Sequence, residues 1–162
     1  MSFVIVNIGS NLGDRRLNLS RAVRALEERF GYFELSHAVE SAPWGFDSTH
    51  SFLNIAMAFH SDDEPYQILK AVREIENSIS PASHRTPEGG YADRVIDIDI
   101  VAIDNEVINT PELTVPHPRL SERSFFLEPL NEIAPGWIHP LTGKSPLQML
   151  IELQEGQKTQ ST

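Results

Sequence analysis

The alternation of hydrophobic and polar positions predicts strands and helices in a definite order along the chain. Residues 3–8 form an apolar run that ends at a glycine, which is typical of a buried strand. A helix is predicted between Asp14, a capping residue, and Gly31, a residue type that commonly ends helices. The helix carries one apolar stripe, at spacings of four, three and four residues: Leu19, Val23, Leu26 and Phe30.

Two further strands and a second helix follow. Residues 35–40 and 52–59 are predicted strands, separated by a loop over 41–51 that contains proline and glycine. The segment 62–65 opens the second helix, with Pro65 at a position that helices tolerate. Its apolar residues also form a single stripe: Ile68, Val72, Ile75 and Ile79. A long loop is expected over 80–93, and an apolar strand follows it.

This order of elements predicts an α+β fold of the ferredoxin-like type, a split βαβ arrangement in one domain over 1–162. The sheet should be antiparallel, with both helices on one face and the other face open to a ligand. C-terminal additions are expected after residue 109, including a short helix around 121–130. The polar tail over 156–162 is expected to be disordered.

Composition narrows the class of protein. The 162 residues include 13 lysines and arginines against 23 aspartates and glutamates, which gives a formal net charge of −10. This charge argues against a nucleic-acid binder, whose surface should be basic. The chain has no cysteine, so disulfides and thiolate chemistry are excluded. Without the pattern of a signal peptide or a membrane span, we expect a cytoplasmic monomer with no nucleic-acid or membrane partner.

Two aspartates on the last predicted strand are the main candidates for metal chemistry. The stretch reads Arg94-Val95-Ile96-Asp97-Ile98-Asp99-Ile100-Val101. Because side chains alternate across a strand, Asp97 and Asp99 should share a face, with Cα atoms about 6–7 Å apart. Magnesium, which prefers oxygen ligands, would offset the repulsion between the two carboxylates. The opposite face should be a core face, formed by Ile96, Ile98, Ile100 and Ala102. The alternative is an edge strand with a solvated acidic face.

Basic residues surround the acidic strand in the sequence. Four arginines lie in or beside the irregular segments next to it: Arg85, Arg94, Arg119 and Arg123. Magnesium together with arginines is typical of sites for phosphoryl-type transfer. His117, held between two prolines, is suited to donate a hydrogen bond to a phosphate. The alternatives are surface ion pairs, worth about 0–1 kcal/mol each, and a histidine in a rigid surface turn.

An aromatic ring and an amide share one face of the third predicted strand. Phe52 and Asn54 lie two residues apart, so a flat heterocycle could stack on the ring while the amide binds its edge. Phe125 or Phe126 could supply a second stacking surface. The alternative places these residues in the core and at a strand end. The turn over 9–13 lacks the spacing of a P-loop or a dinucleotide fingerprint, so both are rejected.

Several short stretches, taken in order, carry a family resemblance. They are Ile8-Gly9-Ser10-Asn11-Leu12-Gly13, Phe52-Leu53-Asn54, Asp93-Arg94-Val95-Ile96-Asp97-Ile98-Asp99-Ile100, Asn105-Glu106-Val107-Ile108-Asn109, Leu113-Thr114-Val115-Pro116-His117, Arg123-Ser124-Phe125-Phe126-Leu127 and Pro129-Leu130-Asn131-Glu132-Ile133-Ala134-Pro135. In order and spacing the chain resembles the 6-hydroxymethyl-7,8-dihydropterin pyrophosphokinase family of folate biosynthesis, from about residue 6 to residue 139.

The resemblance implies transfer of the β,γ-pyrophosphoryl unit of ATP to the hydroxymethyl group of the dihydropterin, with release of AMP. It implies that Asp97 and Asp99 bind two Mg²⁺ ions and that the catalytic residues are Arg85, Arg94 and Asp97. The implied pterin-binding residues are Ser41, Ala42, Trp44, Phe52, Asn54 and Phe125. The implied ATP-binding residues are Glu76, Arg85, Arg94, Ile100, Thr114, His117 and Arg123. The loop over 80–93 would close over ATP.

The chain departs from the family pattern near the acidic strand. Tyr91-Ala92-Asp93 stands before Arg94, where the family usually has Trp-Gly-Pro, and Pro118 follows the histidine. The loop is longer by a few residues and carries His84-Arg85-Thr86 in place of two closely spaced arginines. These departures concern loop closure more than the type of reaction. From the residues alone, a non-catalytic ligand-binding module and a single-strand nucleic-acid binder of the same fold stay open as alternatives.

Overall fold

The structure is a computed structural model that describes residues 1–41, 51–80 and 95–160. Its elements, in chain order, are β1 (Ser2–Ser10), α1 (Arg15–Phe30), β2 (Phe33–Leu35), β3 (Val39–Ser41), β4 (Phe52–Ser61), α2 (Pro65–Ile79), β5 (Asp97–Ile103), β6 (Ile108–Asn109), β7 (Thr114–Val115), the 3₁₀ helix η1 (Leu120–Glu122), α3 (Ser124–Ile133) and α4 (Pro146–Gln160).

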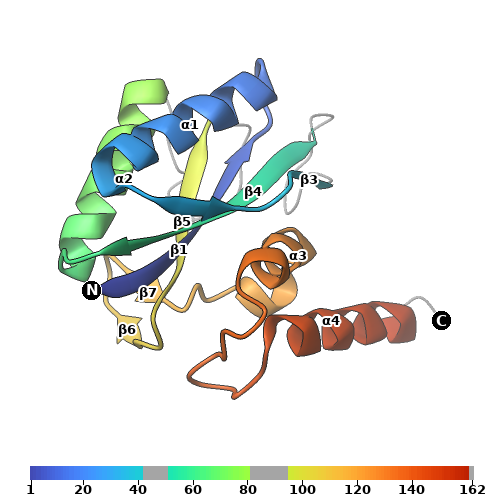
Figure 1. Cartoon of the computed structure of the whole chain (residues 1–162). Helices are drawn as coiled ribbons and strands as arrows, with labels where there is room; N and C mark the ends of the chain where they lie inside the picture. The colour runs from blue at the N-terminus through green and yellow to red at the C-terminus, as the bar shows by residue number, and fades with distance from the viewer. Residues whose placement is uncertain (42–50, 81–94, 161–162) are drawn as a thin grey trace.

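The main sheet is antiparallel, with the strand order β2-β4-β1-β5 (Figure 1). The predicted second strand is two short strands, because β2 and β3 pair with different halves of β4. Between them, Ser36 bonds to Ala56 through both its backbone N–H and its hydroxyl. The strand order and the two crossing helices confirm the predicted ferredoxin-like α+β fold.

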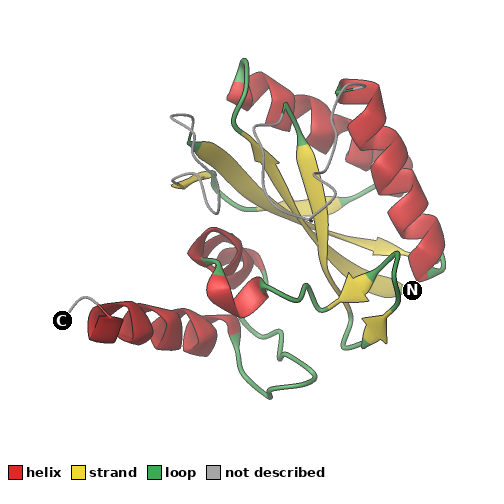
Figure 2. Ribbon diagram, turned by 180° about the vertical axis from the view of Figure 1, so that it is seen from behind, coloured by secondary structure: helices red, strands yellow, loops and turns green. Residues whose placement is uncertain are grey.

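Helices α1 and α2 cover one face of the sheet, as the two apolar stripes predicted (Figures 1 and 2). The carboxylate of Asp14 caps α1 by accepting a hydrogen bond from the N–H of Leu17, and Gly31 ends the helix with a positive φ of 88°. The core on this face includes every second residue of β1, which are Val4, Val6 and Ile8. Strands β4 and β1 are the two inner strands of the order β2-β4-β1-β5.

The opposite face is not open along its whole length. Helices α3 and α4 pack there, against a second core that includes Ile5, Ala58 and Met149 (Figure 2). Helix α4 was not predicted, and it continues through Gly156 to Gln160, where the sequence had suggested a disordered tail. Its contact with α3 stabilises a segment whose own apolar pattern is weak. This face is therefore partly covered by helices, where the sequence had predicted a face open to a ligand.

The alternation of β5 side chains between the two faces of the sheet is interrupted at one point, which the sequence pattern did not predict. Val6 pairs with Ile100 and Ile5 pairs with Ala102, so Val101 is an extra residue, as in a β-bulge. Ile96, Ile98 and Ile100 belong to the core under α1 and α2, as predicted. Ala102, predicted on the same face, instead packs with Val101 in the core under α3. No described helix is long and apolar enough to cross a bilayer.

Candidate active site

The strand register gathers the predicted site residues of the sheet on one face. Asn54 pairs with Gly9, and Gly9 in turn pairs with Asp97, so the three residues form a row across β4, β1 and β5. In the next row Asn7 pairs with Asp99. Because directly paired residues share a face, both aspartates project to the side opposite α1 and α2. The predicted common orientation of the two carboxylates is present in the structure.

The aspartate pair has the composition of a site for a hard cation. Asp97 and Asp99 are buried, with 4% and 8% of their surface exposed. Two buried carboxylates supply oxygen ligands, and Mg²⁺ is commonly held by one or two carboxylates together with water and substrate phosphates. No group of three His, Asp or Glu side chains suited to a metal occurs among the described residues. The residues present therefore fit a metal that arrives with phosphate ligands better than a complete protein cage.

His117 faces the aspartate pair from the segment after β7. Its Nε2 atom lies 4.0 Å from Oδ1 of Asp99, and its Nδ1 atom accepts a hydrogen bond from the N–H of Arg119. An Nδ1 atom that accepts places the proton of a neutral ring on Nε2. The backbone N–H of His117 donates to the carbonyl of Val101, the bulged residue of β5. The bulge thus helps to place a hydrogen-bond donor beside the carboxylates.

Phe125 approaches the same face from the start of α3. The side-chain amide of Asn7 donates to the carbonyl of Phe125 at 3.3 Å, which ties the helix to β1. The rings of Phe125 and Phe126 meet edge to face at a centroid distance of 5.2 Å. Arg123, which is 5% exposed, lies with its guanidinium carbon 5.2 Å from the Phe126 ring centre. A buried cation therefore lies against the Phe126 ring, which also contacts the ring of His117.

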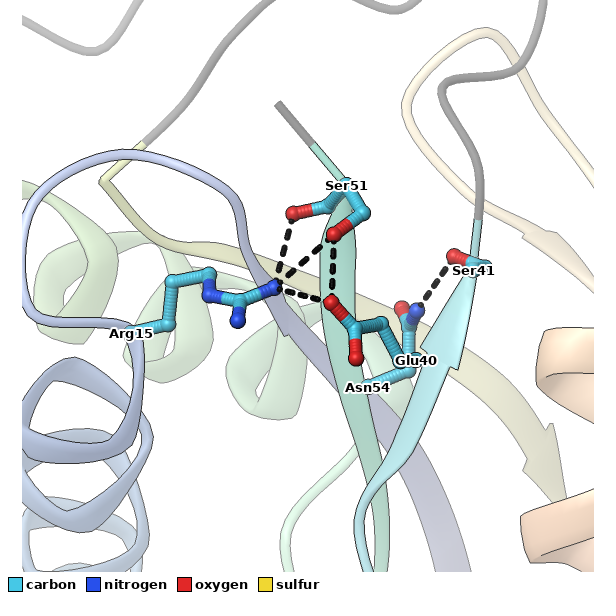
Figure 3. Close-up of polar contacts among 5 residues, drawn as sticks. All are labelled: Arg15, Glu40, Ser41, Ser51 and Asn54. Carbon is cyan, nitrogen blue, oxygen red and sulfur yellow. Dashed lines mark hydrogen bonds and ion pairs between the residues drawn. The ribbon is translucent and has the colours of Figure 1, made fainter. Parts of the chain in front are cut away.

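Asn54 is held over Gly9 by a neighbouring strand. Its Nδ2 atom donates to Oγ of Ser41 at 2.9 Å (Figure 3). Phe52, two residues earlier on β4, pairs with Ser41 in the register and shares the face of Asn54. Phe52 and Asn54 are 6% and 3% exposed. The ring, the amide and the hydroxyl predicted to bind the pterin are thus side by side.

Arg15 joins the two strand ends that lead out of β3 and into β4. Its Nη1 atom donates to Oε1 of Glu40 and to the hydroxyl and carbonyl of Ser51, each at 3.1 Å (Figure 3). The Ser51 hydroxyl also donates to Glu40 at 2.6 Å. The hydrogen bond from Ser51, and then the hydrogen bond and charge of Arg15, lower the pKa of Glu40. Glu40 and Arg15 therefore stabilise the strand ends on either side of residues 42–50.

Comparison with known proteins identifies the family. The model of the family described as 7,8-dihydro-6-hydroxymethylpterin-pyrophosphokinase (HPPK) matches residues 5–135. The chain belongs to this family. The predicted resemblance is confirmed, and so is the predicted enzyme class, a pyrophosphokinase of folate biosynthesis, at the level of the HPPK family.

Two curated relatives carry the family's enzyme name and are matched over most of their length. A 2-amino-4-hydroxy-6-hydroxymethyldihydropteridine pyrophosphokinase of Porphyromonas gingivalis is 41% identical over 142 residues, which cover 86% of this chain and 95% of the relative. One from Aquifex aeolicus is 37% identical over 144 residues, with 89% and 88% covered. The crystal structure of Plasmodium falciparum HPPK-DHPS wild type with pteroate has a TM-score of 0.78 at 13% identity. It supports the fold alone, and this chain covers 44% of that longer chain while 99% of this chain is matched.

Other residues predicted for the HPPK site lie outside the row of Asn54, Gly9 and Asp97. The side chain of Ile100 lies in the core under α1 and α2, so only its backbone can face a ligand. Thr114 pairs with Asn109 in the β6-β7 hairpin, beyond the acidic strand. Glu76 is buried on α2 and accepts a hydrogen bond from the N–H of Ile98 at 2.7 Å. Ala42, Trp44, Arg85, Arg94 and nearly all of the loop predicted over 80–93 lie outside the described residues.

Sequence reasoning missed three residues that shape this site. Asn7 ties α3 to β1, Gly9 leaves room for Asn54, and Arg73 bonds to the carbonyl of Ile98 at 3.2 Å. A signal for the first two was available, because Asn7 and Gly9 interrupt an otherwise apolar strand on the face opposite Val6 and Ile8. Arg73 had no such signal, since its contact joins a helix to a strand 25 residues away.

Proposed function

We propose that this chain transfers the β,γ-pyrophosphoryl unit of ATP to the hydroxyl of 6-hydroxymethyl-7,8-dihydropterin. The hydroxyl oxygen attacks the β-phosphorus, the bond from that phosphorus to the α,β-bridging oxygen breaks, and AMP leaves. The products are AMP and the pterin diphosphate. The observation that carries the proposal is the row of Asn54, Gly9 and Asp97, in which only β1 separates the Asn54 amide from a buried pair of carboxylates.

The pterin is assigned to the end of the sheet near β3. Phe52 on β4 and Phe125 at the start of α3 would stack on the two faces of the ring system. Asn54 would read the hydrogen-bonding edge, held in place by Ser41. Ala42 and Trp44 are proposed to add contacts in the same region, on the basis of the family resemblance.

The nucleotide phosphates are assigned to the acidic strand. Asp97 and Asp99 would hold two Mg²⁺ ions, which when bound neutralise phosphate charge and orient the β-phosphorus for attack. Asp97, directly opposite Gly9, is the proposed acceptor of the hydroxyl proton. His117 would donate from Nε2 to a phosphate oxygen, and Arg123 would offset negative charge from its buried position beside the rings of Phe125 and Phe126.

The remaining assignments rest on the family resemblance. Arg85 and Arg94 are proposed to neutralise charge that develops on the transferred group. Glu76, Ile100 and Thr114 are proposed to lie at the ATP site, Ile100 through its backbone. The cytoplasmic location, the monomeric state and the lack of a nucleic-acid partner stay predictions.

Phosphorus NMR of the reaction mixture tests the proposed reaction. With ATP, Mg²⁺ and the pterin alcohol, we expect equal amounts of AMP and pterin diphosphate to appear together. ADP with a pterin monophosphate would contradict transfer of the pyrophosphoryl unit. A pterin that binds without any consumption of ATP would instead support the alternative of a non-catalytic ligand-binding module.

A further inference from the structure

The two peptide groups that join Asp97 to Asp99 are both bonded by side chains of α2. The N–H of Ile98 donates to Oε2 of Glu76 at 2.7 Å, and the carbonyl of Ile98 accepts from Nη1 of Arg73 at 3.2 Å. The same Nη1 atom donates to Oε1 of Glu76 at 2.7 Å. Three hydrogen bonds therefore close a ring between one helix turn and one residue of the acidic strand.

These contacts satisfy backbone hydrogen-bonding groups at the edge of the sheet. Strand β5 stands at one end of the strand order in the described part of the chain, so one side of its backbone has no strand beside it. The N–H and carbonyl of a strand residue point to the same side, and those of Ile98 point away from β1, toward α2. Arg73 and Glu76 supply the donor and acceptor that a neighbouring strand would otherwise supply.

The position of Ile98 gives the contacts a consequence for the carboxylates. The φ and ψ angles of Ile98 alone set the direction of the peptide before it relative to the peptide after it, and these peptides carry Asp97 and Asp99. Glu76 bonds the first peptide and Arg73 bonds the second. Fixing both peptides therefore fixes the separation of the two Cα atoms that carry the acidic side chains.

We propose that Arg73 and Glu76 are positioning residues that hold Asp97 and Asp99 at a metal-binding separation before any cation arrives. The proposal rests on the proposed function, because it assigns that spacing to Mg²⁺ and nucleotide phosphates. Arg73 has a second role, since its charge offsets that of Glu76, whose side chain is only 10% exposed. Support from outside the ligands themselves is typical of metal sites.

The test compares four variants of the full chain. Arg73→Met removes the donor to the Ile98 carbonyl, and Glu76→Gln leaves one acceptor oxygen where Arg73 and the N–H of Ile98 each use one. Lys70→Met and Glu74→Gln change the same charges at exposed positions of the same helix and serve as controls. Amide hydrogen exchange of Ile98 reports on the contacts, and that of Ala58, in the centre of the sheet, reports on the fold.

We expect Ile98 to exchange at least about tenfold faster in both Arg73→Met and Glu76→Gln, while Ala58 keeps its protection. The Mg²⁺ concentration for half-maximal transfer should rise about tenfold in both variants and stay unchanged in both controls. Folded variants with unaltered Ile98 exchange, or with faster exchange but an unchanged Mg²⁺ requirement, would overturn the proposal. Failure of the proposed function would look different, because the wild type itself would then show no Mg²⁺-dependent transfer.

Discussion

The side-chain amide of Asn54 lies directly over the backbone of Gly9. A methyl group on Gly9 would lie 2.9 Å from Oδ1 of Asn54 and 3.4 Å from the Phe52 ring. The first distance is shorter than such contacts allow, so an added methyl must displace the amide. The absence of a side chain at residue 9 therefore leaves room for the Asn54 amide, which the proposed pterin site uses. Gly9 also pairs with Asp97, so only β1 lies between Asn54 and Asp97.

Replacement of Gly9 by alanine should weaken pterin binding without loss of the fold. Displacement of the Asn54 amide should lower the affinity at least about tenfold, which corresponds to about 1.4 kcal/mol. Calorimetric titration of the pterin in the presence of Mg²⁺ and a non-hydrolysable ATP analogue measures this. Gly136→Ala is the matched control, because a methyl there meets no atom within 4 Å. Equal pterin affinity in both variants would refute the proposed crowding.

Removal of the Ser41 hydroxyl should loosen the same amide more mildly. Ser41→Ala deletes the acceptor of the 2.9 Å hydrogen bond from Asn54. A hydrogen bond between two uncharged groups contributes about 0.5–1.5 kcal/mol. We expect a severalfold rise in KM for the pterin and an unchanged KM for ATP. Steady-state kinetics with each substrate varied in turn measures the two KM values separately. Ser20→Ala, at an exposed position of α1, should change neither value, and an equal effect on both substrates would count against a role confined to the pterin.

The lowered pKa of Glu40 predicts a direction for the dependence of stability on pH. Because the folded state favours the ionised carboxylate, the contribution of Glu40 is present above its ordinary pKa of 4.5 and is lost as the pH falls through the lower folded value. Thermal midpoints of the wild type and Glu40→Gln should therefore differ at neutral pH and converge in acid. The matched variant Glu34→Gln, on the neighbouring strand, should follow the wild type. A gap between wild type and Glu40→Gln that widens in acid would contradict the assignment.

Local patterns were sufficient to predict the parts of the site that lie within one element. Alternation along β5 places Asp97 and Asp99 on one face, and the spacing of Phe52 and Asn54 does the same on β4. Alternation failed at Ala102, because the bulge at Val101 inserts one residue and shifts the next to the other face. A bulge depends on contacts such as the hydrogen bond to Val101 from His117, a residue 16 positions further along the chain.

Contacts between distant elements explain the other differences. The apolar pattern of α4 is too weak to predict a helix after several prolines, and its contact with α3 supplies the stability that the pattern lacks. The requirement for glycine at residue 9 arises from Asn54, which becomes its neighbour only when β1 and β4 pair. Arg73 resembles any exposed helical arginine in sequence, and only the packing of α2 against the edge of β5 gives it a partner.

The Mg²⁺ dependence of pyrophosphoryl transfer in aspartate variants tests the central claim most directly. Asp97→Asn and Asp99→Asn keep the shape of each side chain but remove the charge that would bind the cation. Asp62→Asn makes the same change at an exposed site and is the control. We predict that each site variant loses at least about 100-fold in kcat at saturating Mg²⁺, equivalent to about 2.7 kcal/mol, while Asp62→Asn keeps full activity. Wild-type turnover with an unchanged Mg²⁺ requirement in either site variant would contradict the account.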